Sequence, residues 1–354
     1  MNITVDEVTG ALKHVVHPSA GKDVVSLGMV QDMRIDGLAV AFTLVFAKAQ
    51  DPVKNSIVGA CEKALRYYVH PEVTVQIRTL PEPSAPKAAK KQTLQAKHII
   101  AVASGKGGVG KSTVAVNLAV ALSRMGYSVG LLDADIYGPS VPKMLGVEGI
   151  TPEARTEQGE ERIIPVERYG VRILSIGFFV PANDAVIWRG PMATSALKQL
   201  LYQAEWGNPD FLLIDLPPGT GDVHLTIVQE LPLTGAVIVS TPQQVALADV
   251  VKGVNMFRNE KVNVPVLGLV ENMAWFTPAE LPQSRYYLFG KEGCKQLAER
   301  ENLPLLAQIP LVQSIGESSD NGRPIVANED SAVAQAFMNL AENVVTAVGK
   351  LKIG

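Results

Sequence analysis

The fold of this chain is decided by the stretch Ile99-Ile100-Ala101-Val102-Ala103-Ser104-Gly105-Lys106-Gly107-Gly108-Val109-Gly110-Lys111-Ser112-Thr113. An apolar, strand-like run leads into a glycine-rich turn, and a helix-period segment follows from Val114 to Arg124. The turn fits G-x-x-x-x-G-K-[ST], in which backbone N–H groups wrap phosphates, the lysine reaches the β and γ oxygens and the hydroxyl binds Mg²⁺. We therefore predict that a nucleotide binds to Gly105, Lys106, Gly107, Gly108, Val109, Gly110, Lys111, Ser112 and Thr113.

Length and composition set the broad class of the protein. With 354 residues, 47% of them hydrophobic and 19% charged, the chain can bury a large core and form two domains. No apolar run approaches the roughly 18 residues of a membrane span, and the N-terminus lacks a basic region followed by an apolar stretch, so we expect a cytoplasmic protein without a membrane partner. A net charge of −3 gives no electrostatic case for bulk nucleic acid as a partner.

Three regions follow one another along the chain. Residues 1–80 predict a small α/β domain, residues 81–97 are a linker rich in proline, alanine and lysine, and residues 98–354 predict a doubly wound, mostly parallel sheet. The small domain shows a helical pattern over Val5–Val16, an apolar run over Val24–Val30, alternation over Leu38–Phe46, a helical pattern around Val53–Tyr68 and an apolar alternation over Val73–Ile77.

Acidic residues of the large domain stand at strand ends, where sheets of this class bind their ligands. Asp133 and Asp135 come directly after one strand, and Asp215 ends another in a Walker B pattern that places its carboxylate near Mg²⁺. The Pro-Pro-Gly-Thr-Gly-Asp segment from Pro217 to Asp222 should rearrange when the nucleotide is hydrolysed. The expected strands after the first are Ser128–Asp133, Val171–Ile176, Phe211–Asp215, Gly235–Ser240, Val264–Val270 and Leu305–Ile309.

Nearly the whole chain resembles the Mrp/ApbC-type P-loop ATPases, an iron–sulfur cluster carrier family related to the MinD and ParA ATPases. Lys106 completes K-G-G-x-G-K-[ST], the deviant Walker A form of the phosphate loop. The small domain resembles the iron–sulfur assembly domain often fused ahead of such ATPases. The motifs that carry the resemblance are Gly105–Thr113, Leu132–Ser140, Ile187–Met192, Ile214–Asp222, Ser240–Gln244 and Glu271–Met273.

This resemblance implies a homodimer that binds ATP and Mg²⁺, hydrolyses ATP slowly and carries a [4Fe–4S] cluster to apo iron–sulfur proteins or assembly factors. It implies that Lys106 crosses the dimer interface to the partner's nucleotide and that Asp135 positions or activates the attacking water. Adenine is expected beside Asn272 and Pro310, and the chain has no Asn-Lys-x-Asp, the usual guanine-reading motif. The implied catalytic residues are Lys106, Lys111 and Asp135, and the implied Mg²⁺ ligands are Ser112, Asp135 and Asp215.

The chain departs from the family at its sulfur ligands. Family members usually carry C-P-x-C where this chain has Thr277-Pro278-Ala279-Glu280, and iron–sulfur clusters require thiolates, commonly four. In the small domain, Asp51 precedes Pro52 where a cysteine is common. The two cysteines, Cys61 and Cys294, form no C-x-x-C, so no cluster ligand is assigned and Cys294 stays a weak candidate. The sequence favours an ATP-driven switch without direct cluster binding over a carrier with unusual ligands.

Two other classes of function are compared with this one. A MinD- or ParA-like spatial organiser would expose an amphipathic C-terminal helix with a basic flank, whereas here we expect core packing because only Lys350 and Lys352 are basic. A reductase similar to the nitrogenase iron protein would need cluster cysteines near the switch segments, and the sequence has none. The C-terminal apolar stripe comprises Val333, Phe337, Leu340, Val344 and Val348.

Overall fold

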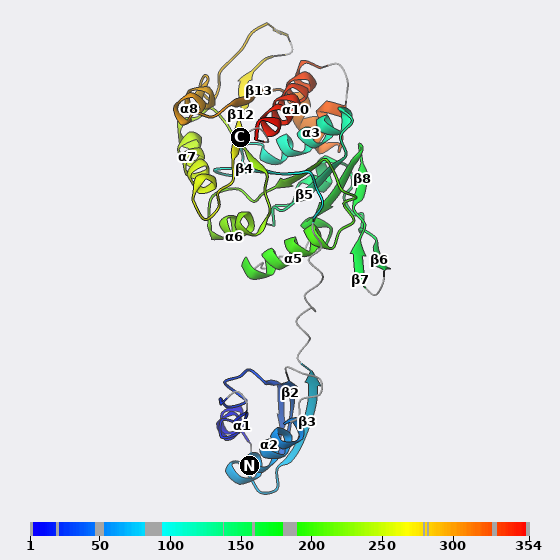
Figure 1. Cartoon of the computed structure of the whole chain (residues 1–354), viewed down its shortest axis with the longest axis vertical. Coiled ribbons are helices and arrows are strands. Elements are labelled where there is room, and N and C mark those ends of the chain that lie inside the picture. Colours follow the sequence, from blue (N-terminus) through cyan, green and yellow to red (C-terminus); the bar gives the residue numbers. More distant parts are fainter. Residues whose placement is uncertain are drawn as a thin grey trace. The chain divides into compact units, whose positions relative to one another are not determined.

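The chain forms two compact units, Met1–Lys91 and Gln92–Gly354, in a computed structural model. Figure 1 shows both units along the sequence from blue to red. The structure describes residues 3–18, 21–46, 53–81, 94–136, 138–157, 160–179, 190–278, 280–281, 283–327 and 331–351.

An eight-stranded sheet forms the centre of the larger unit. Its strand order is β13-β12-β11-β4-β10-β5-β9-β8, and every neighbouring pair is parallel except β8 with β9. The central strands are buried on both faces, as expected for parallel sheets between helices, and the predicted doubly wound class is confirmed. The strands are β4 (His98–Ser104), β5 (Val129–Asp133), β8 (Val166–Arg168), β9 (Val171–Ser175), β10 (Phe211–Asp215), β11 (Gly235–Ser240), β12 (Val266–Phe276) and β13 (Leu305–Leu311).

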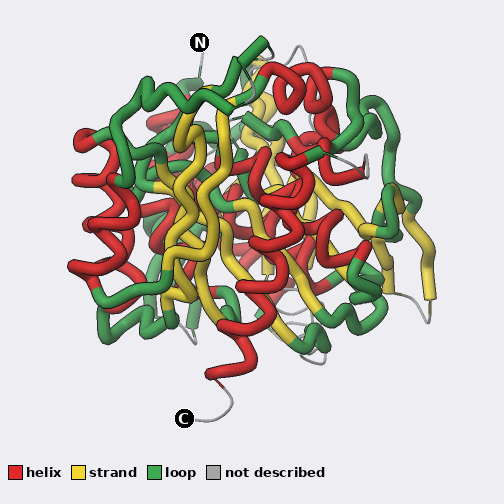
Figure 2. Tube along the Cα trace, turned by 90° about the horizontal axis from the view of Figure 1, so that it is seen from above, coloured by secondary structure: helices red, strands yellow, loops and turns green. Residues whose placement is uncertain are grey.

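Helices cover both faces of this sheet (Figures 1 and 2). Successive residues of β4 alternate between the two sides: Ile100 and Val102 pack with α3 and α10, whereas Ile99 and Ala101 pack with α5, α6, α7 and α8. The helices are α3 (Lys111–Arg124), α4 (Val141–Met144), α5 (Gly190–Tyr202), α6 (Asp222–Glu230), α7 (Gln244–Arg258), α8 (Gly293–Glu301), α9 (Gln313–Asp320) and α10 (Ala332–Leu351), with 3-10 turns η1 (Ile176–Phe178) and η2 (Ile325–Ala327).

The C-terminal helix α10 belongs to the core. Its apolar stripe, from Val333 to Val348, is buried in the same cluster as α3, as the sequence predicts. Among the described residues, no helix combines the length and the hydropathy that crossing a membrane requires.

A three-stranded sheet and two helices form the smaller unit. β1 pairs antiparallel with β2, β2 pairs parallel with β3, and both helices contribute to one buried cluster. The apolar run Val24–Val30 is a turn over most of its length, because Gly28 takes a positive φ of 68°, and only Val30 enters β1. The elements are α1 (Val5–Leu12), β1 (Val30–Asp36), β2 (Ala39–Phe46), α2 (Lys54–Tyr68) and β3 (Thr74–Pro81).

Some predicted features differ from the structure or lie outside its described part. The first helix ends at Leu12 rather than Val16. An antiparallel pair, β6 (Ala154–Glu157) with β7 (Glu160–Ile163), is absent from the sequence analysis because these short strands carry no apolar run. Asp51, Pro52 and most of the predicted linker lie outside the described residues.

Candidate nucleotide site

The phosphate loop joins β4 to α3 at the carboxyl edge of the sheet. Gly110 precedes the helix with φ 79°, and a Cβ on it would lie 2.2 Å from Nδ2 of Asn272. A Cβ on Gly105 would lie 2.5 Å from the backbone carbon of Asp249 in α7. The close approach of the α7 backbone therefore requires a glycine at position 105, and the positive φ of the turn requires one at position 110. The N-terminus of α3 directs its free N–H groups into this loop, which favours an anion there.

Lys111 is buried, which is rare for a lysine unless it is paired. Its Nζ lies 2.6 Å from Oδ1 of Asp215 and 3.8 Å from Oδ2 of Asp135, and it donates to the Ser112 hydroxyl at 3.2 Å. The structure thus brings the predicted Lys111, Ser112, Asp135 and Asp215 together although they come from three segments of the chain. Oδ2 of Asp215 is buried and has no hydrogen-bond partner among the described residues.

A cavity of about 270 Å³ opens over the phosphate loop. Lys111 lines it and Asp215 does not, so the lysine stands between the cavity and the buried carboxylate. The half-buried Lys106 also lines this cavity, and no described residue forms an ion pair with its ammonium. The lining also includes Gly107, Gly108, Gly110, Ser112, Thr113, Asp135 and Ser140.

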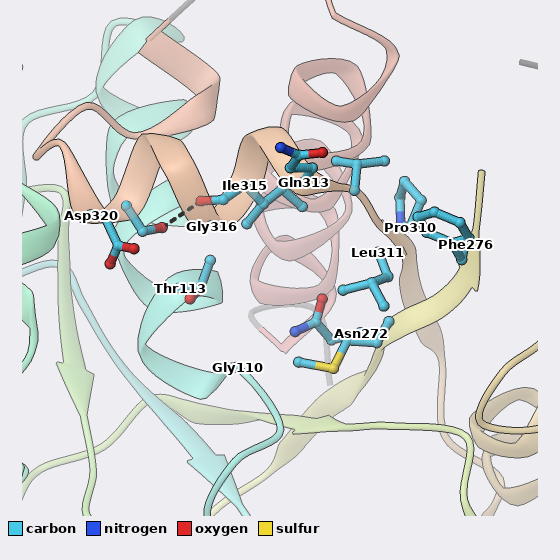
Figure 3. A pocket seen from close by; sticks show the side chains of 13 residues that line it. Gly110, Thr113, Asn272, Phe276, Pro310, Leu311, Gln313, Ile315, Gly316 and Asp320 are labelled. Atoms are coloured by element: carbon cyan, nitrogen blue, oxygen red, sulfur yellow. Dashed lines mark hydrogen bonds between the residues drawn. The ribbon is translucent and has the colours of Figure 1, made fainter. Parts of the chain in front are cut away.

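A second cavity of about 450 Å³ adjoins the first, because Gly110 and Thr113 line both. Below, the first is called the phosphate-side cavity and the second the base-side cavity, after the part of the nucleotide that is expected in each. Asn272 and Pro310 lie on its wall, as Figure 3 shows, so the two residues expected beside the base do share one cavity. The helix α9 covers the cavity with the polar residues Gln313, Ser319 and Asp320. The sequence analysis missed α9, because this helix buries none of its residues and shows no apolar period.

Asn272 is fixed by the irregular end of β12. Its Nδ2 donates to the Val109 carbonyl of the phosphate loop at 2.8 Å. The next residue, Met273, has φ 55°, and the pairing of β12 with β13 shifts between Asn272 and Phe276. This bulge turns the strand end toward the cavity. Asn272 is therefore tied to the loop as well as exposed to the base-side cavity, a contact that the sequence pattern did not reveal.

Asp133 has a structural task that the sequence analysis did not assign. Its carboxylate accepts the backbone N–H groups of Asp135 at 3.1 Å and Val141 at 3.3 Å, and the Ser175 hydroxyl at 2.9 Å. Burial, followed by the neighbouring Asp215 carboxylate, raises the pKa of Asp133 to about 7. Asp133 therefore holds the loop that carries Asp135.

The weak cluster candidate Cys294 is a core residue. It lies at the start of α8, fully buried, with its N–H donating to Oε2 of Glu271 at 2.6 Å and its Sγ 3.8 Å from the Thr241 carbonyl. Burial, followed by the Glu271 carboxylate, raises the pKa of the Cys294 thiol, and burial raises that of Cys61 to about 12. Thiolate is the form that binds iron, and burial disfavours the thiolate form of both cysteines.

The segment in place of C-P-x-C forms a loop closed by a backbone pair. Phe276 and Tyr286 exchange N–H···O bonds of 2.8 and 2.9 Å, and the Arg285 guanidinium lies 4.2 Å from the centre of the Trp275 ring. Within the described part of the chain, no three histidine, cysteine, aspartate or glutamate side chains are grouped to hold a metal ion. Ala279 and the Ile187-Trp188-Arg189 portion of another family motif lie outside that part.

This sheet, with a phosphate loop between β4 and α3 and a base-side cavity beside it, defines a P-loop nucleotide-binding protein. A family model described as "NUBPL iron-transfer P-loop NTPase" matches residues 95–345, and one described as "Iron-sulfur cluster assembly protein" matches residues 5–77. The chain belongs to the NUBPL iron-transfer P-loop NTPase family. The resemblance stated from the motifs is thereby confirmed.

Relatives and solved structures agree with this assignment. The chain is 44% identical to the iron–sulfur cluster carrier protein of Synechocystis sp., over 97% of both chains. It is 50% identical to the iron–sulfur cluster transfer protein NUBPL of Dictyostelium discoideum, over 70% of this chain and 76% of that one. Among solved structures, it is similar to a nucleotide-binding protein of Archaeoglobus fulgidus in complex with ADP, with 38% identity, a TM-score of 0.59 and coverage of 70% of this chain and 95% of that one.

Proposed function

We propose that this chain is a Mg²⁺-dependent ATPase that acts in iron–sulfur cluster assembly or transfer. The observation that carries the nucleotide part is the pair of adjoining cavities, one over the phosphate loop and one beside Asn272 and Pro310, with Gly110 and Thr113 in both linings. A nucleotide needs one space for its phosphates and an adjoining space for its base. The resemblance to a solved ADP complex supports the same proposal.

Lys111 changes partners when the nucleotide binds in this proposal. In the structure its ammonium pairs with Asp215, and phosphate oxygens would compete for it with charge-assisted hydrogen bonds. Ser112, Asp135 and Asp215 would then hold Mg²⁺ together with the phosphates, because hard oxygen ligands suit this ion and Oδ2 of Asp215 already lacks a hydrogen-bond partner in the described structure. The ion would neutralise phosphate charge in the transition state.

Hydrolysis requires a water molecule placed in line with the terminal phosphate. Asp135 lines the phosphate-side cavity and is held by Asp133 from behind, so we assign it the positioning of that water. Lys106 lines the same cavity and has no described ion-pair partner. We assign it to the nucleotide of a second copy in a homodimer.

The cluster is cargo in this account and not a resident group. Thr277 and Glu280 replace the expected thiols, and both cysteines are buried. We therefore propose that the chain drives cluster handling through its nucleotide-dependent state while another protein supplies the thiolates. The names of its relatives as carrier and transfer proteins support this place in metalloprotein assembly.

The test of the ATPase is a comparison of wild type with Asp135→Ala. Water positioning acts in the transition state, so the variant should still bind ATP, with Mg·ATP affinity reduced by no more than about tenfold through the lost Mg²⁺ ligand, and should lose turnover by about a hundredfold or more. Equilibrium binding and phosphate release measure the two quantities on the same preparations. Wild type that binds no Mg·ATP would contradict the proposed function, and a variant with unchanged turnover would remove Asp135 from the catalytic residues.

A further inference from the structure

A buried serine stands behind the loop that carries Asp135. Ser175 is the last residue of β9, fully buried, and it pairs in register with Asp133 at the end of β5. Its hydroxyl donates to Oδ2 of Asp133 at 2.9 Å and accepts the Gly177 N–H at 3.0 Å. The hydroxyl therefore acts both as a donor and as an acceptor, and the group that it donates to is a buried carboxylate.

Asp133 connects Ser175 to the loop that carries Asp135. It does not line the phosphate-side cavity, whereas Asp135 does. Oδ1 of Asp133 accepts the N–H of Asp135, and Oδ2 accepts the N–H of Val141, so the two oxygens hold both ends of the loop. Rotation of this carboxylate would displace Asp135 relative to the cavity.

The turn after Ser175 touches the same loop from another side. A Cβ on Gly177 would lie 3.0 Å from Cβ and Cγ of Pro139 and 3.2 Å from the Ser175 hydroxyl. The segment Ser175–Gly177 thus packs behind the Asp135 loop, with a hydrogen bond to Asp133 at one end and a glycine with little room for a Cβ beside Pro139 at the other.

We propose that Ser175 is a positioning residue for nucleotide hydrolysis, acting through Asp133 on Asp135. The proposal rests on the ATPase function proposed above. Without the hydroxyl, Oδ2 of Asp133 keeps only the long 3.3 Å bond from Val141, and a buried carboxylate that loses a donor turns toward other donors. Small misplacements of a reacting group reduce turnover while leaving ligand binding intact.

The experiment compares Ser175→Ala with wild type in steady-state ATP hydrolysis and in Mg·ADP affinity. We expect kcat to fall by about tenfold, with KM and Mg·ADP affinity within about twofold of wild type. Ser175→Thr retains a hydroxyl and should recover most of kcat. Gly177→Ala, which pushes on Pro139 without removing the hydrogen bond, should lower kcat in the same way.

Ser128→Ala is the matched control. The Ser128 hydroxyl donates to Oδ2 of Asp210 at 2.8 Å, which is the same kind of serine–aspartate hydrogen bond. These two residues directly precede β5 and β10, so they lie at the amino ends of the strands. Its loss should leave kcat unchanged. Thermal unfolding of each variant identifies any general loss of fold.

The outcomes separate the two proposals. Wild type that hydrolyses ATP together with a Ser175→Ala variant of equal kcat would overturn the role of Ser175 and leave the ATPase intact. A raised KM with unchanged kcat would overturn it as well, because the serine would then affect binding. Wild type that hydrolyses no ATP would overturn the ATPase and the role of Ser175 together.

Discussion

At the scale of single residues, the site is organised around one buried cation. Lys111 lines the phosphate-side cavity and contacts two carboxylates: Asp135, which lines the same cavity, and Asp215, which is completely buried. Removing a lysine from such a group costs binding energy for the phosphates and leaves a buried carboxylate without its cation. In the proposed function, nucleotide binding replaces the Asp215 partner of this lysine with phosphate oxygens.

We predict that Lys111→Ala weakens Mg·ATP binding about ten- to a hundredfold, the value of a charge-assisted hydrogen bond. Isothermal titration calorimetry measures this directly. Lys143→Ala is the control, because Lys143 is exposed and pairs with the exposed Glu148. Wild-type affinity in Lys111→Ala would remove Lys111 from the site.

A second residue-scale prediction concerns His224 in α6. Its Nδ1 lies 3.0 Å from the Pro217 carbonyl, its Nε2 is buried, and burial, assisted by Lys111, lowers its pKa from 6.5 to about 4. The unfolded chain therefore takes up the proton at a higher pH than the folded chain does. The stability from neutral His224 is complete above pH 6.5 and is lost as the pH falls toward 4, by up to about 3 kcal/mol.

Urea unfolding at several pH values, followed by tryptophan fluorescence, tests this dependence because all three tryptophans belong to the larger unit. His224→Gln should unfold with a shallower pH dependence between 6.5 and 4 than wild type does. Identical slopes for the two proteins would show that His224 titrates normally in the fold.

At the scale of elements, strand ends decide what the site contains. β4, β5, β10 and β12 deliver the phosphate loop, the Asp133–Asp135 pair, Asp215 and Asn272 to one edge of the sheet. Parallel strands bring their carboxyl ends together, so residues more than a hundred positions apart meet there. The bulge at Met273 turns the end of β12, so that Asn272 donates a hydrogen bond to the phosphate loop and also lines the base-side cavity.

We expect Asn272→Ala to lower Mg·ADP affinity about tenfold and to reduce the expected preference for ADP over GDP, because the amide supports the loop and lines the cavity proposed for the base. Calorimetry with both nucleotides measures the change. Asn343→Ala removes a similar bond, from Nδ2 to the Leu306 carbonyl at 2.8 Å, outside the nucleotide cavities and should have no effect. An unchanged ADP preference in Asn272→Ala would separate Asn272 from base selection.

Sequence patterns revealed the parts of this architecture that repeat or that carry a motif. Continuous apolar runs identified the central strands, and the glycine spacing identified the loop at Gly105–Gly110. The patterns did not reveal Ser175, Gly177 or the polar residues of α9, because their roles depend on contacts between segments distant in sequence. The apolar run Val24–Val30 did not by itself indicate its structure, which is a turn at Gly28 that only Val30 leaves to enter β1.

At the scale of the whole molecule, the proposed nucleotide site belongs to a chain whose two cysteines are both buried. The family comparison covers both the larger unit, at residues 95–345, and the smaller one, at residues 5–77. The stated resemblance implies C-P-x-C where this chain has Thr277-Pro278-Ala279-Glu280, whereas residues Gly105 to Thr113 contain a complete K-G-G-x-G-K-[ST]. A second copy of the chain is the partner that Lys106 requires in this account.

Mixed dimers test that requirement. Lys106→Ala and Asp135→Ala should each abolish turnover alone, whereas their equal mixture should recover about a quarter of wild-type activity, because half of the dimers are mixed and one of their two sites is complete. Phosphate release before and after mixing measures this. Failure to recover activity, with dimers verified by size, would mean that Lys106 acts on its own chain's nucleotide.

We propose a working nucleotide site in a protein that holds no cluster on its own cysteines. Anaerobic incubation of the purified chain with iron, sulfide and Mg·ATP, followed by desalting and measurement of nucleotide and iron on one sample, tests it most directly. We predict about one nucleotide per chain and no retained iron or visible cluster absorption. A stable cluster on wild type that disappears in Cys294→Ala would contradict the claim and assign the cargo site to that cysteine.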